Sequence, residues 1–245
     1  MPGSPLITFA APLLEGTFVR RHKRFSVEAQ IGGKLAWVHT NNTGSMQGLL
    51  KEGNGILVSE SFNPARKMAY TLEFIKSGKV WCGVNTSLPG RVLKAAFLAG
   101  ELDFTAGYSD IALEQNLPDD LSLQGERSRL DALITGDGKI PIWVECKNVT
   151  LVREGVAAFP DAATTRGQKH LRQLIHLKKH GLRAACFFLV QRGDAGCFSP
   201  ASDIDPEYSR LFWQACDAGV EMSSYFSEYR DGAIRIIGKL PINKK

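Results

Sequence analysis

Two apolar runs with a glycine-containing turn between them stand out near the middle of the chain. They occupy residues 130–134 and 140–144, and the tetrapeptide Gly-Asp-Gly-Lys at 136–139 separates them. Two such runs joined by a short turn predict a β-hairpin. Because successive side chains of a strand point to opposite faces, Glu145 and Lys147 share one face after the second run.

The register of this hairpin decides whether Asp131 lies on the face of Glu145. A strict two-residue turn at Asp137 and Gly138 would pair Asp131 with Val144 and point the two carboxylates to opposite faces. A three-residue loop or a β-bulge would set Asp131 opposite Glu145. We predict the second register, which brings both carboxylates and the following lysine to one pocket.

After the hairpin, the pattern continues as that of an α/β domain. It predicts a helix, a strand covered on both faces, a second helix and a second strand, at residues 164–181, 184–190, 205–219 and 220–226. A further helix is expected at 90–99, before the hairpin. Because the hairpin is antiparallel and helical crossovers connect parallel strands, we expect a mixed sheet.

The N-terminal part of the chain has a different pattern. Short β-like segments separated by glycine-containing turns occupy residues 25–31, 35–39, 55–59, 70–75 and 80–84. Evenly spaced strands of this kind predict a small closed barrel, and an OB fold is one of few options. The junction between the two regions is expected directly after these strands, so we divide the chain into residues 1–85 and 86–245.

Asp131, Glu145 and Lys147 are the first candidates for chemistry. Two carboxylates suit a hard divalent cation, Mg²⁺ or Mn²⁺, and an ammonium suits a developing negative charge. The backbone carbonyl of Cys146 would be a further metal ligand. An isolated Asp…Glu-x-Lys pattern is more often a solvated surface hairpin. Here the apolar run at 142–144 indicates a core strand, and charges at its end need partners or a metal.

Gln168 is the catalytic candidate from the helix at 164–181. It precedes Leu171 by three residues and Ile175 by seven, so we expect it on the buried face at the start of the helix. There it would position a water or a phosphate oxygen. A glutamine that only caps the helix is an equal alternative. Lys169 and the other basic residues of this helix suit either phosphate contacts or a solvated face.

Charge separates the two regions. Residues 1–85 hold ten lysines and arginines against five glutamates, whereas the remainder holds twenty residues of each sign. The densest basic cluster is residues 20–24, with Phe18 and Phe25 beside it, which suits a phosphate backbone and base stacking; a solvated face is the alternative. Our candidates for nucleic-acid binding are Arg20, Arg21, Lys23, Arg24, Arg66, Lys67 and Lys169.

Composition excludes several classes. No run reaches the roughly 18 apolar residues of a membrane span, so no membrane partner is expected. The N-terminus lacks the charged and apolar regions of a signal peptide, and five cysteines without a Cys-x-x-Cys pair suit a reducing cytoplasm. Neither a P-loop nor a Gly-x-Gly-x-x-Gly motif occurs, so a small-molecule enzyme would lack any recognisable cofactor motif.

With these motifs in order, the sequence resembles two known groups. The α-β-β-β-α-β order with Asp131 and Glu145-x-Lys147 resembles the PD-(D/E)XK nuclease superfamily. The sequence motifs resemble those of the sugar fermentation stimulation protein A (SfsA) family more closely still. The resemblance is carried by Asn-Thr-Gly-Ser-Met at 42–46, Val-Asn-Thr at 84–86, Glu-Arg-Ser-Arg-Leu-Asp at 126–131, Val-Glu-Cys-Lys-Asn-Val-Thr-Leu at 144–151, Phe-Pro-Asp-Ala at 159–162 and Thr-Arg-Gly-Gln-Lys-His-Leu at 165–171.

The resemblance implies an OB-like, nucleic-acid-binding barrel over residues 1–85 and a PD-(D/E)XK nuclease-like domain over 86–245. It gives Asp131 and Glu145 the metal-site role and Lys147 the role of catalytic lysine. The departures are small. Asn41 stands where Cys-Pro is expected, and Cys-Lys-Asn at 146–148 replaces a commoner Val-Lys-Ser, so no charged motif residue is altered. The physiological role of the family is poorly defined.

Two functions follow from these observations. The leading hypothesis is a cytoplasmic DNA-binding protein with a Mg²⁺-dependent phosphodiesterase, or nuclease, site. The alternative is a non-catalytic, non-specific DNA-binding regulatory protein of sugar metabolism. The sequence leaves open whether RNA replaces DNA, whether the chain forms a homodimer and whether turnover occurs.

Overall fold

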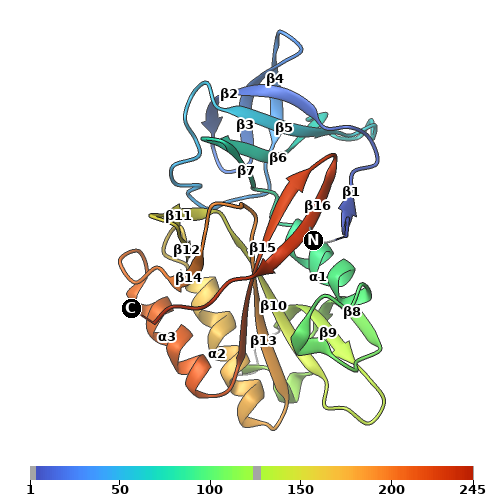
Figure 1. The fold of residues 1–245 in the computed structure, drawn as a ribbon, viewed down its shortest axis with the longest axis vertical. Helices are drawn as coiled ribbons and strands as arrows, with labels where there is room; N and C mark the ends of the chain where they lie inside the picture. The colour runs from blue at the N-terminus through green and yellow to red at the C-terminus, as the bar shows by residue number, and fades with distance from the viewer. Residues whose placement is uncertain (1–3, 124–127, 245) are drawn as a thin grey trace.

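The computed structural model describes residues 4–123 and 128–244, and Figure 1 shows a β-barrel above a larger mixed-sheet domain. Glu126 and Arg127 of the resemblance described above lie outside the described residues. The barrel region contains β2 (Leu14–His22), β3 (Ser26–Ile31), β4 (Lys34–His39), β5 (Gly55–Glu60), β6 (Tyr70–Ser77) and β7 (Val80–Gly83).

The barrel closes as the sequence pattern predicts. Its strands follow the order β4-β3-β2-β5-β6-β7, and an additional pairing of β4 with β6 closes a ring of five. The strands expected between residues 25 and 84 are all present. The pattern does not predict β2 as a strand, because a bulge between Phe18 and Arg20 interrupts its alternation and leaves a basic run at its end.

The second region is the mixed-sheet α/β domain that the pattern predicts. Its sheet has the order β1-β16-β15-β13-β10-β9-β8, with β10, β13 and β15 parallel and the outer pairs antiparallel. Its strands are β1 (Ile7–Thr8), β8 (Asp110–Asn116), β9 (Arg129–Thr135), β10 (Ile142–Val149), β13 (Arg183–Val190), β15 (Glu221–Arg230) and β16 (Ala233–Lys239).

Helices and a small sheet complete this domain. The helices are α1 (Leu88–Leu98), α2 (Thr165–Lys179) and α3 (Pro206–Asp217), with short 3₁₀ turns at Asp103–Thr105 and Asp119–Leu121. A separate three-stranded sheet, in the order β11-β12-β14, consists of β11 (Leu151–Arg153), β12 (Val156–Phe159) and β14 (Cys197–Pro200). In the ribbon this small sheet lies beneath the barrel (Figure 1).

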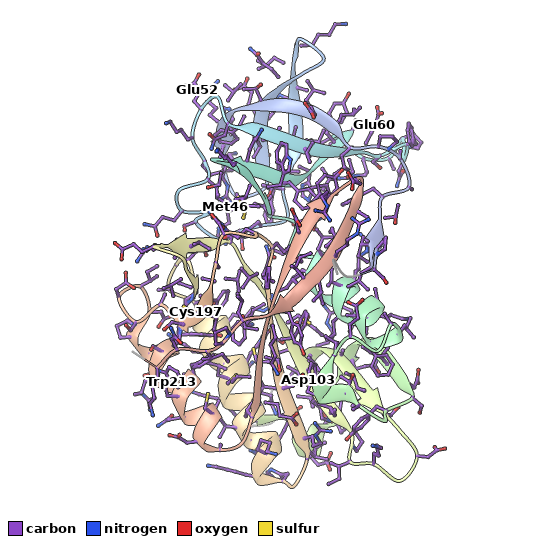
Figure 2. The ribbon with its side chains drawn as sticks, in the orientation of Figure 1. Met46, Glu52, Glu60, Asp103, Cys197 and Trp213 are labelled. Carbon is purple, nitrogen blue, oxygen red and sulfur yellow. The ribbon has the colours of Figure 1, made fainter. Side chains whose placement is uncertain are left out.

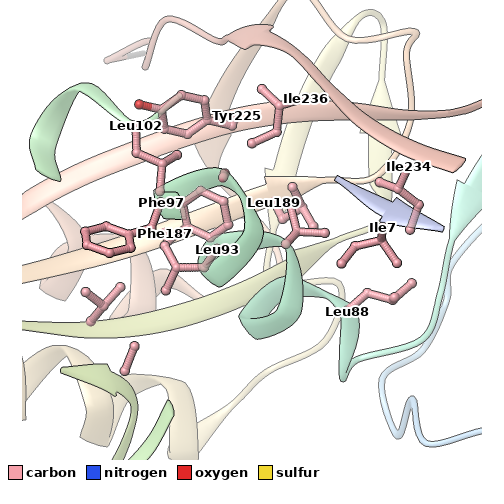
Figure 3. Packing of buried hydrophobic residues seen from close by; sticks show 14 of the residues in the cluster. Ile7, Leu88, Leu93, Phe97, Leu102, Phe187, Leu189, Tyr225, Ile234 and Ile236 are labelled. Atoms are coloured by element: carbon pink, nitrogen blue, oxygen red, sulfur yellow. The ribbon is translucent and has the colours of Figure 1, made fainter. Parts of the chain in front are cut away.

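The central strand β13 carries side chains to both faces of the sheet, and each face has its own core. Phe187 and Leu189 pack in one cluster with Leu93 and Phe97 of α1, as Figure 3 shows. Phe188 belongs to a second cluster, which α2 and α3 complete on the other face. This strand is buried almost from end to end, as its continuous apolar run predicts. The three-layer packing fixes β10 and β13 as a rigid support.

The barrel meets the α/β domain at a buried junction. Met46 lies there, at the lower edge of the barrel in Figure 2, and its side chain is fully buried. β10, which carries Glu145 and Lys147, leads into this junction, where the side chain of Asn148 donates a 3.3 Å hydrogen bond to the carbonyl of Gly83. Among the described helices, none is both long and apolar enough to cross a membrane.

Candidate functional site

A cleft of about 830 Å³ opens between the barrel and the α/β domain. The barrel contributes Arg24 and the loop at residues 41–44 to its lining. The α/β domain contributes the ends of β9 and β10, the start of α1 and the start of α2. Asp131, Glu145 and Lys147 all line this cleft, so the three residues singled out by the hairpin argument lie together.

The hairpin has the register that the sequence argument requires. Val144 pairs with Ala132, and continuation of this antiparallel register sets Asp131 beside Glu145. The backbone N–H of Cys146 donates a 2.6 Å hydrogen bond to Oδ2 of Asp131. The prediction that Asp131 lies opposite Glu145 is therefore confirmed, and both carboxylates reach the same cleft.

Glu145 is the most buried ionisable group of the cleft, with an exposed fraction of 3%. Its Oε1 accepts a 2.5 Å hydrogen bond from Nζ of Lys147 and also contacts Nδ1 of His170. Its Oε2 is buried and has no hydrogen-bond partner among the described residues. Burial opposes ionisation of this carboxyl, but Lys147 and His170 outweigh it and lower its pKa to about 2.

Asp131 behaves in the opposite way. Burial and the neighbouring charge of Glu145 raise its pKa to about 6, although the N–H of Cys146 partly counteracts them. The two carboxylates therefore repel each other, and the lysine that neutralises Glu145 does not neutralise Asp131 to the same degree. A cation placed between them would relieve this repulsion.

Lys147 is the positive charge of the site, and its ammonium is held in place rather than free. Its exposed fraction is 8%, and its Nζ lies against Oε1 of Glu145. Burial would lower its pKa, but the charge of Glu145 outweighs burial, so the pKa of Lys147 is raised. The side chain is thus a fixed cation at the cleft.

His170 is a cleft residue that the sequence argument did not single out. It lies on α2, is 8% exposed, and places Nδ1 against Oε1 of Glu145 and 3.3 Å from Nζ of Lys147. A signal was present, because His170 precedes the buried Leu174 by four residues and Leu177 by seven, on one face of the helix. A histidine on an apolar face is commonly a core residue, so spacing alone did not distinguish it.

Gln168 does not join the carboxylates. Its side-chain amide donates to both oxygens of Asp205, at 3.0 and 3.2 Å, and Asp205 is the N-cap of α3. Gln168 therefore links the starts of two helices, which favours the structural alternative over positioning of water or phosphate. Lys169 is half-buried beside it and is not among the residues that line the cleft.

The basic cluster at residues 20–24 divides into different environments. Arg20 is exposed and forms a 2.6 Å ion pair with Glu28. Arg21 is directed inward, and burial lowers its pKa. Its guanidinium donates to the backbone carbonyls of Gly44, Asn42 and Arg24, at 2.7, 2.7 and 2.8 Å. Arg21 therefore holds the loop at residues 41–44, which lines the cleft, instead of extending into solvent.

The remaining basic candidates are exposed. Lys23 lies in a turn with a φ of 46°, and Arg24 extends from the same turn to line the cleft. Arg66 and Lys67 lie in the loop between β5 and β6, where Arg66 donates a 2.9 Å hydrogen bond to Oγ1 of Thr71. Arg24 is thus the barrel candidate that the structure places beside the carboxylates.

Two segments that are far apart in the sequence fasten the barrel to the α/β domain. Oδ2 of Asp161 accepts a 2.7 Å hydrogen bond from the N–H of Met46, and the hydroxyl of Ser45 donates to the carbonyl of Asp161 at 2.6 Å. A Cβ on Gly44 would lie 2.8 Å from Oδ1 of Asp161. The motifs at 42–46 and 159–162 therefore contact each other. Glycine is favoured at residue 44 because the carboxylate of Asp161 approaches its Cα closely.

The donors of the cleft fit a hard divalent cation that keeps several waters. Within residues 4–123 and 128–244, no group of three or more His, Cys, Asp or Glu side chains is arranged around a metal position. The orphaned Oε2 of Glu145 and the carboxylate of Asp131 nevertheless provide two oxygen ligands. Mg²⁺ is commonly bound through one or two carboxylates with water completing the shell, so this donor set suffices.

Comparison with known proteins covers both regions. Residues 19–84 match the family model of the SfsA N-terminal OB domain, and residues 87–232 match that of the sugar fermentation stimulation protein RE domain. A sugar fermentation stimulation protein homolog from Maridesulfovibrio salexigens is 48% identical over 240 residues, covering 97% of each chain. A homolog from Syntrophobacter fumaroxidans is 51% identical over 225 residues, covering 91% of this chain and 83% of its own.

A solved structure has the same fold over almost the whole chain. It is that of SfsA from Pyrococcus furiosus in complex with Ca²⁺, which matches with a TM-score of 0.88 and 26% sequence identity. The match covers 98% of this chain and 100% of that chain. The arrangement of barrel and α/β domain described above is therefore shared with a structure determined for a distant relative.

Proposed function

The chain belongs to the sugar fermentation stimulation protein family, and on this premise we propose that it is a DNA-binding protein with a Mg²⁺-dependent phosphodiesterase site. One observation carries the proposal. The carboxylates of Asp131 and Glu145 and the ammonium of Lys147 meet in a cleft, where Oε2 of Glu145 is buried without a partner. An unpaired buried carboxylate oxygen beside a second carboxylate is what a cation site requires.

In this proposal Asp131 and Oε2 of Glu145 hold the cation, together with the backbone carbonyl of Cys146. Mg²⁺ or Mn²⁺ is the metal we expect, and the Ca²⁺ bound to SfsA from Pyrococcus furiosus supports a hard divalent cation in this fold. When bound, such an ion would polarise the scissile phosphate and acidify the attacking water. The raised pKa of Asp131 supports this assignment, because a cation would satisfy the two repelling carboxylates.

The chain's own residues would orient and stabilise the reacting phosphate. Lys147 is fixed by Glu145, so its ammonium is preorganised to orient the water or to stabilise charge that develops on phosphate oxygens. Arg24, Arg91 and Arg166 line the cleft and make no ion pair within the described part of the chain. The N-termini of α1 and α2 also border it, and their backbone N–H groups favour anions.

The barrel supplies the nucleic-acid affinity in this proposal. Its strands match an OB domain, and residues 1–85 carry the whole formal positive excess of the chain. Exposed Arg20, Lys23 and Arg24 are the first phosphate contacts we expect, with Arg66 and Lys67 on a second loop. We retain the division at residues 85 and 86 and a cytoplasmic location as parts of the proposal. DNA is the preferred partner, and neither RNA nor a homodimer is required.

A second function is favoured by a different observation. Oε1 of Glu145 is occupied by both Lys147 and His170, a closed arrangement that would also suit a stable groove without turnover. A non-catalytic, non-specific DNA-binding regulatory protein would keep the barrel and the cleft and use neither for cleavage.

One assay separates the two functions. The purified protein is incubated with Mg²⁺ or Mn²⁺ and labelled single-stranded, duplex and branched DNA, with a chelator control. The enzyme proposal expects metal-dependent cleavage of at least one substrate, and binding of DNA without cleavage of any of them supports the regulatory protein. Absence of DNA binding rejects both.

A further inference from the structure

Aromatic rings follow one another along the outer surface of the barrel. Trp37 and Phe25 are each 50% exposed, which is unusual for side chains of this size. The ring of His22 meets Trp37 edge-on with centroids 4.6 Å apart, and Phe25 stacks on His39 at 6.3 Å with an interplanar angle of 15°. Rings with exposed faces in sequence are the platforms on which unpaired bases stack.

The row of rings leads to the cleft. Trp37, His39 and Asn41 occupy every second position, so they follow one side of β4 and its extension, and Asn41 lines the cleft. The turn that carries Phe25 is fixed at the same place, because the carbonyl of Phe25 accepts a 3.0 Å hydrogen bond from the N–H of Thr40.

Arg24 connects the rings to the candidate active site. It directly precedes Phe25, and its backbone carbonyl accepts a 2.8 Å hydrogen bond from the half-buried Arg21. Its own side chain lines the cleft that contains Asp131 and Glu145. We call Trp37, His39, Phe25 and Arg24 the stacking track, since they form one path from the barrel surface to the carboxylates.

The charges along this path suit a polyanion. Glu28 faces the same surface from β3, but Arg20 pairs with its Oε2 at 2.6 Å and compensates its charge, and the ring of His22 lies 3.1 Å from the same oxygen. Arg24 makes no ion pair among the residues that the structure describes. A nucleic-acid strand on the track therefore meets exposed rings and an available cation rather than an uncompensated acid.

We propose that the chain acts on single-stranded DNA, which lies along the stacking track and passes Arg24 into the cleft. This inference rests on the proposed function and specifies its substrate. Bases in a duplex are already paired and stacked, so their faces are not available to Trp37 or Phe25. Glu145 and Lys147 are also only 3% and 8% exposed, so a phosphate must enter the cleft to reach them, which a single strand does more readily than a rigid duplex.

The test compares binding of one labelled sequence as a single strand and as a duplex, by fluorescence anisotropy in EDTA so that metal-dependent cleavage is prevented. We expect the wild-type chain to prefer the single strand. Trp37→Ala and Phe25→Ala should each weaken single-strand affinity by roughly tenfold or more, because one base loses its stacking partner. The slope of log K against log salt should not change, because no phosphate contact is lost.

Leu98→Ala is the control, since Leu98 is 70% exposed on α1 and belongs neither to the track nor to the lining of the cleft. It should bind like wild type, and circular dichroism should show that all three variants are folded. Quenching of tryptophan fluorescence by the single strand, measured at saturation, should be smaller in Trp37→Ala.

Three results would overturn the proposal: duplex bound as tightly as the single strand, unchanged affinity of Trp37→Ala and Phe25→Ala, or tighter binding of an RNA strand. If the wild-type chain prefers duplex DNA, the stacking track is rejected, but the proposal that the protein binds DNA is not. Failure to bind any nucleic acid rejects the proposed function and the track together.

Discussion

Asp131 and Glu145 are neighbours on adjacent antiparallel strands, and their carboxylates have opposite environments. Glu145 is neutralised by Lys147, which helps to lower its pKa to about 2, whereas burial and Glu145 raise the pKa of Asp131 to about 6. The stability of the metal-free protein is therefore lower than that of a chain without this repulsion. In the proposed function, a cation bound between the two carboxylates would relieve this repulsion.

Asp131→Asn should stabilise the metal-free protein and weaken its metal site. The folded-state pKa of Asp131 is raised from 3.8 to about 6, so its contribution to stability is present below the lower value and is lost as the pH rises through the higher one. The variant should thus gain up to about 3 kcal/mol at pH 7. Urea unfolding in EDTA from pH 4 to pH 8 measures this gain, which should disappear near pH 4.

Calorimetric titration with Mg²⁺ or Mn²⁺ completes this test. Loss of one anionic ligand should weaken binding of the cation in Asp131→Asn. A variant that binds the cation as well as wild type would remove Asp131 from the metal site, whatever its effect on stability.

Lys147 separates catalysis from binding. Lys147→Gln keeps a hydrogen-bond donor for Glu145 but removes the charge, so cleavage should fall by on the order of 10²-fold or more while DNA affinity changes little. Lys147→Ala should also lower stability, because it leaves the buried Glu145 with His170 as its remaining side-chain partner. Single-turnover cleavage, DNA binding and thermal unfolding are measured for both variants. If wild type cleaves no substrate above the Lys147→Gln background, the regulatory function replaces the enzyme.

Arg21 and Arg24 form a matched pair with opposite expectations. Arg21→Ala removes the guanidinium that donates hydrogen bonds to three backbone carbonyls, so it should lower the free energy of unfolding by about 1–3 kcal/mol. Arg24→Ala should leave stability unchanged, weaken DNA binding and make the slope of log K against log salt shallower by roughly 0.7–0.9. Chemical unfolding and salt-dependent binding distinguish them. An unchanged salt slope in Arg24→Ala would show that this arginine touches no phosphate.

The sequence predicted the parts of the fold that depend on local alternation. The hairpin at β9 and β10 and the strand β13, which is buried on both faces, have apolar patterns strong enough to determine the element, whereas the face of Asp131 depended on the register of the hairpin. Short or edge strands escaped prediction. The alternation of β8 is interrupted at Glu114, whose φ is 56°. In β16 the alternation is short, with buried Ile234 and Ile236 on either side of Arg235, and β16 was not among the predicted strands.

The remaining differences between the predicted and the observed site come from contacts between residues that are far apart in the sequence. Gln168 has the spacing of a buried helix residue, but its partner Asp205 begins another helix, and no local pattern shows that they meet. Arg21 and Arg24 belong to one basic run, yet the turn between them directs one to backbone carbonyls and the other to the cleft. His170 lies on the apolar face of its helix, where the pattern indicates a core residue. Its contact with the charged Glu145 appears only when the helix and β10 are packed together.

The contact between Gly44 and Asp161 provides a last prediction, because it couples the barrel to the cleft. A Cβ at residue 44 would lie 2.8 Å from Oδ1 of Asp161 and 3.0 Å from Oδ1 of Asn42, which leaves no room for a methyl group without movement. Gly44→Ala should therefore displace Asp161 and weaken its hydrogen bond with the N–H of Met46. We expect a loss of about 1–3 kcal/mol in stability and slower cleavage.

Gly48→Ser is the comparison variant, since a Cβ there has no neighbour within 4 Å, although its φ of 79° makes it strained for any side chain. It should lower stability through backbone strain alone and leave the cleavage rate of the folded fraction unchanged. Gly44→Ala should lower both, because Asp161 and the loop at 41–44 line the cleft. Equal effects of the two variants on cleavage would mean that the contact of Gly44 with Asp161 supports the fold but does not set the geometry of the site.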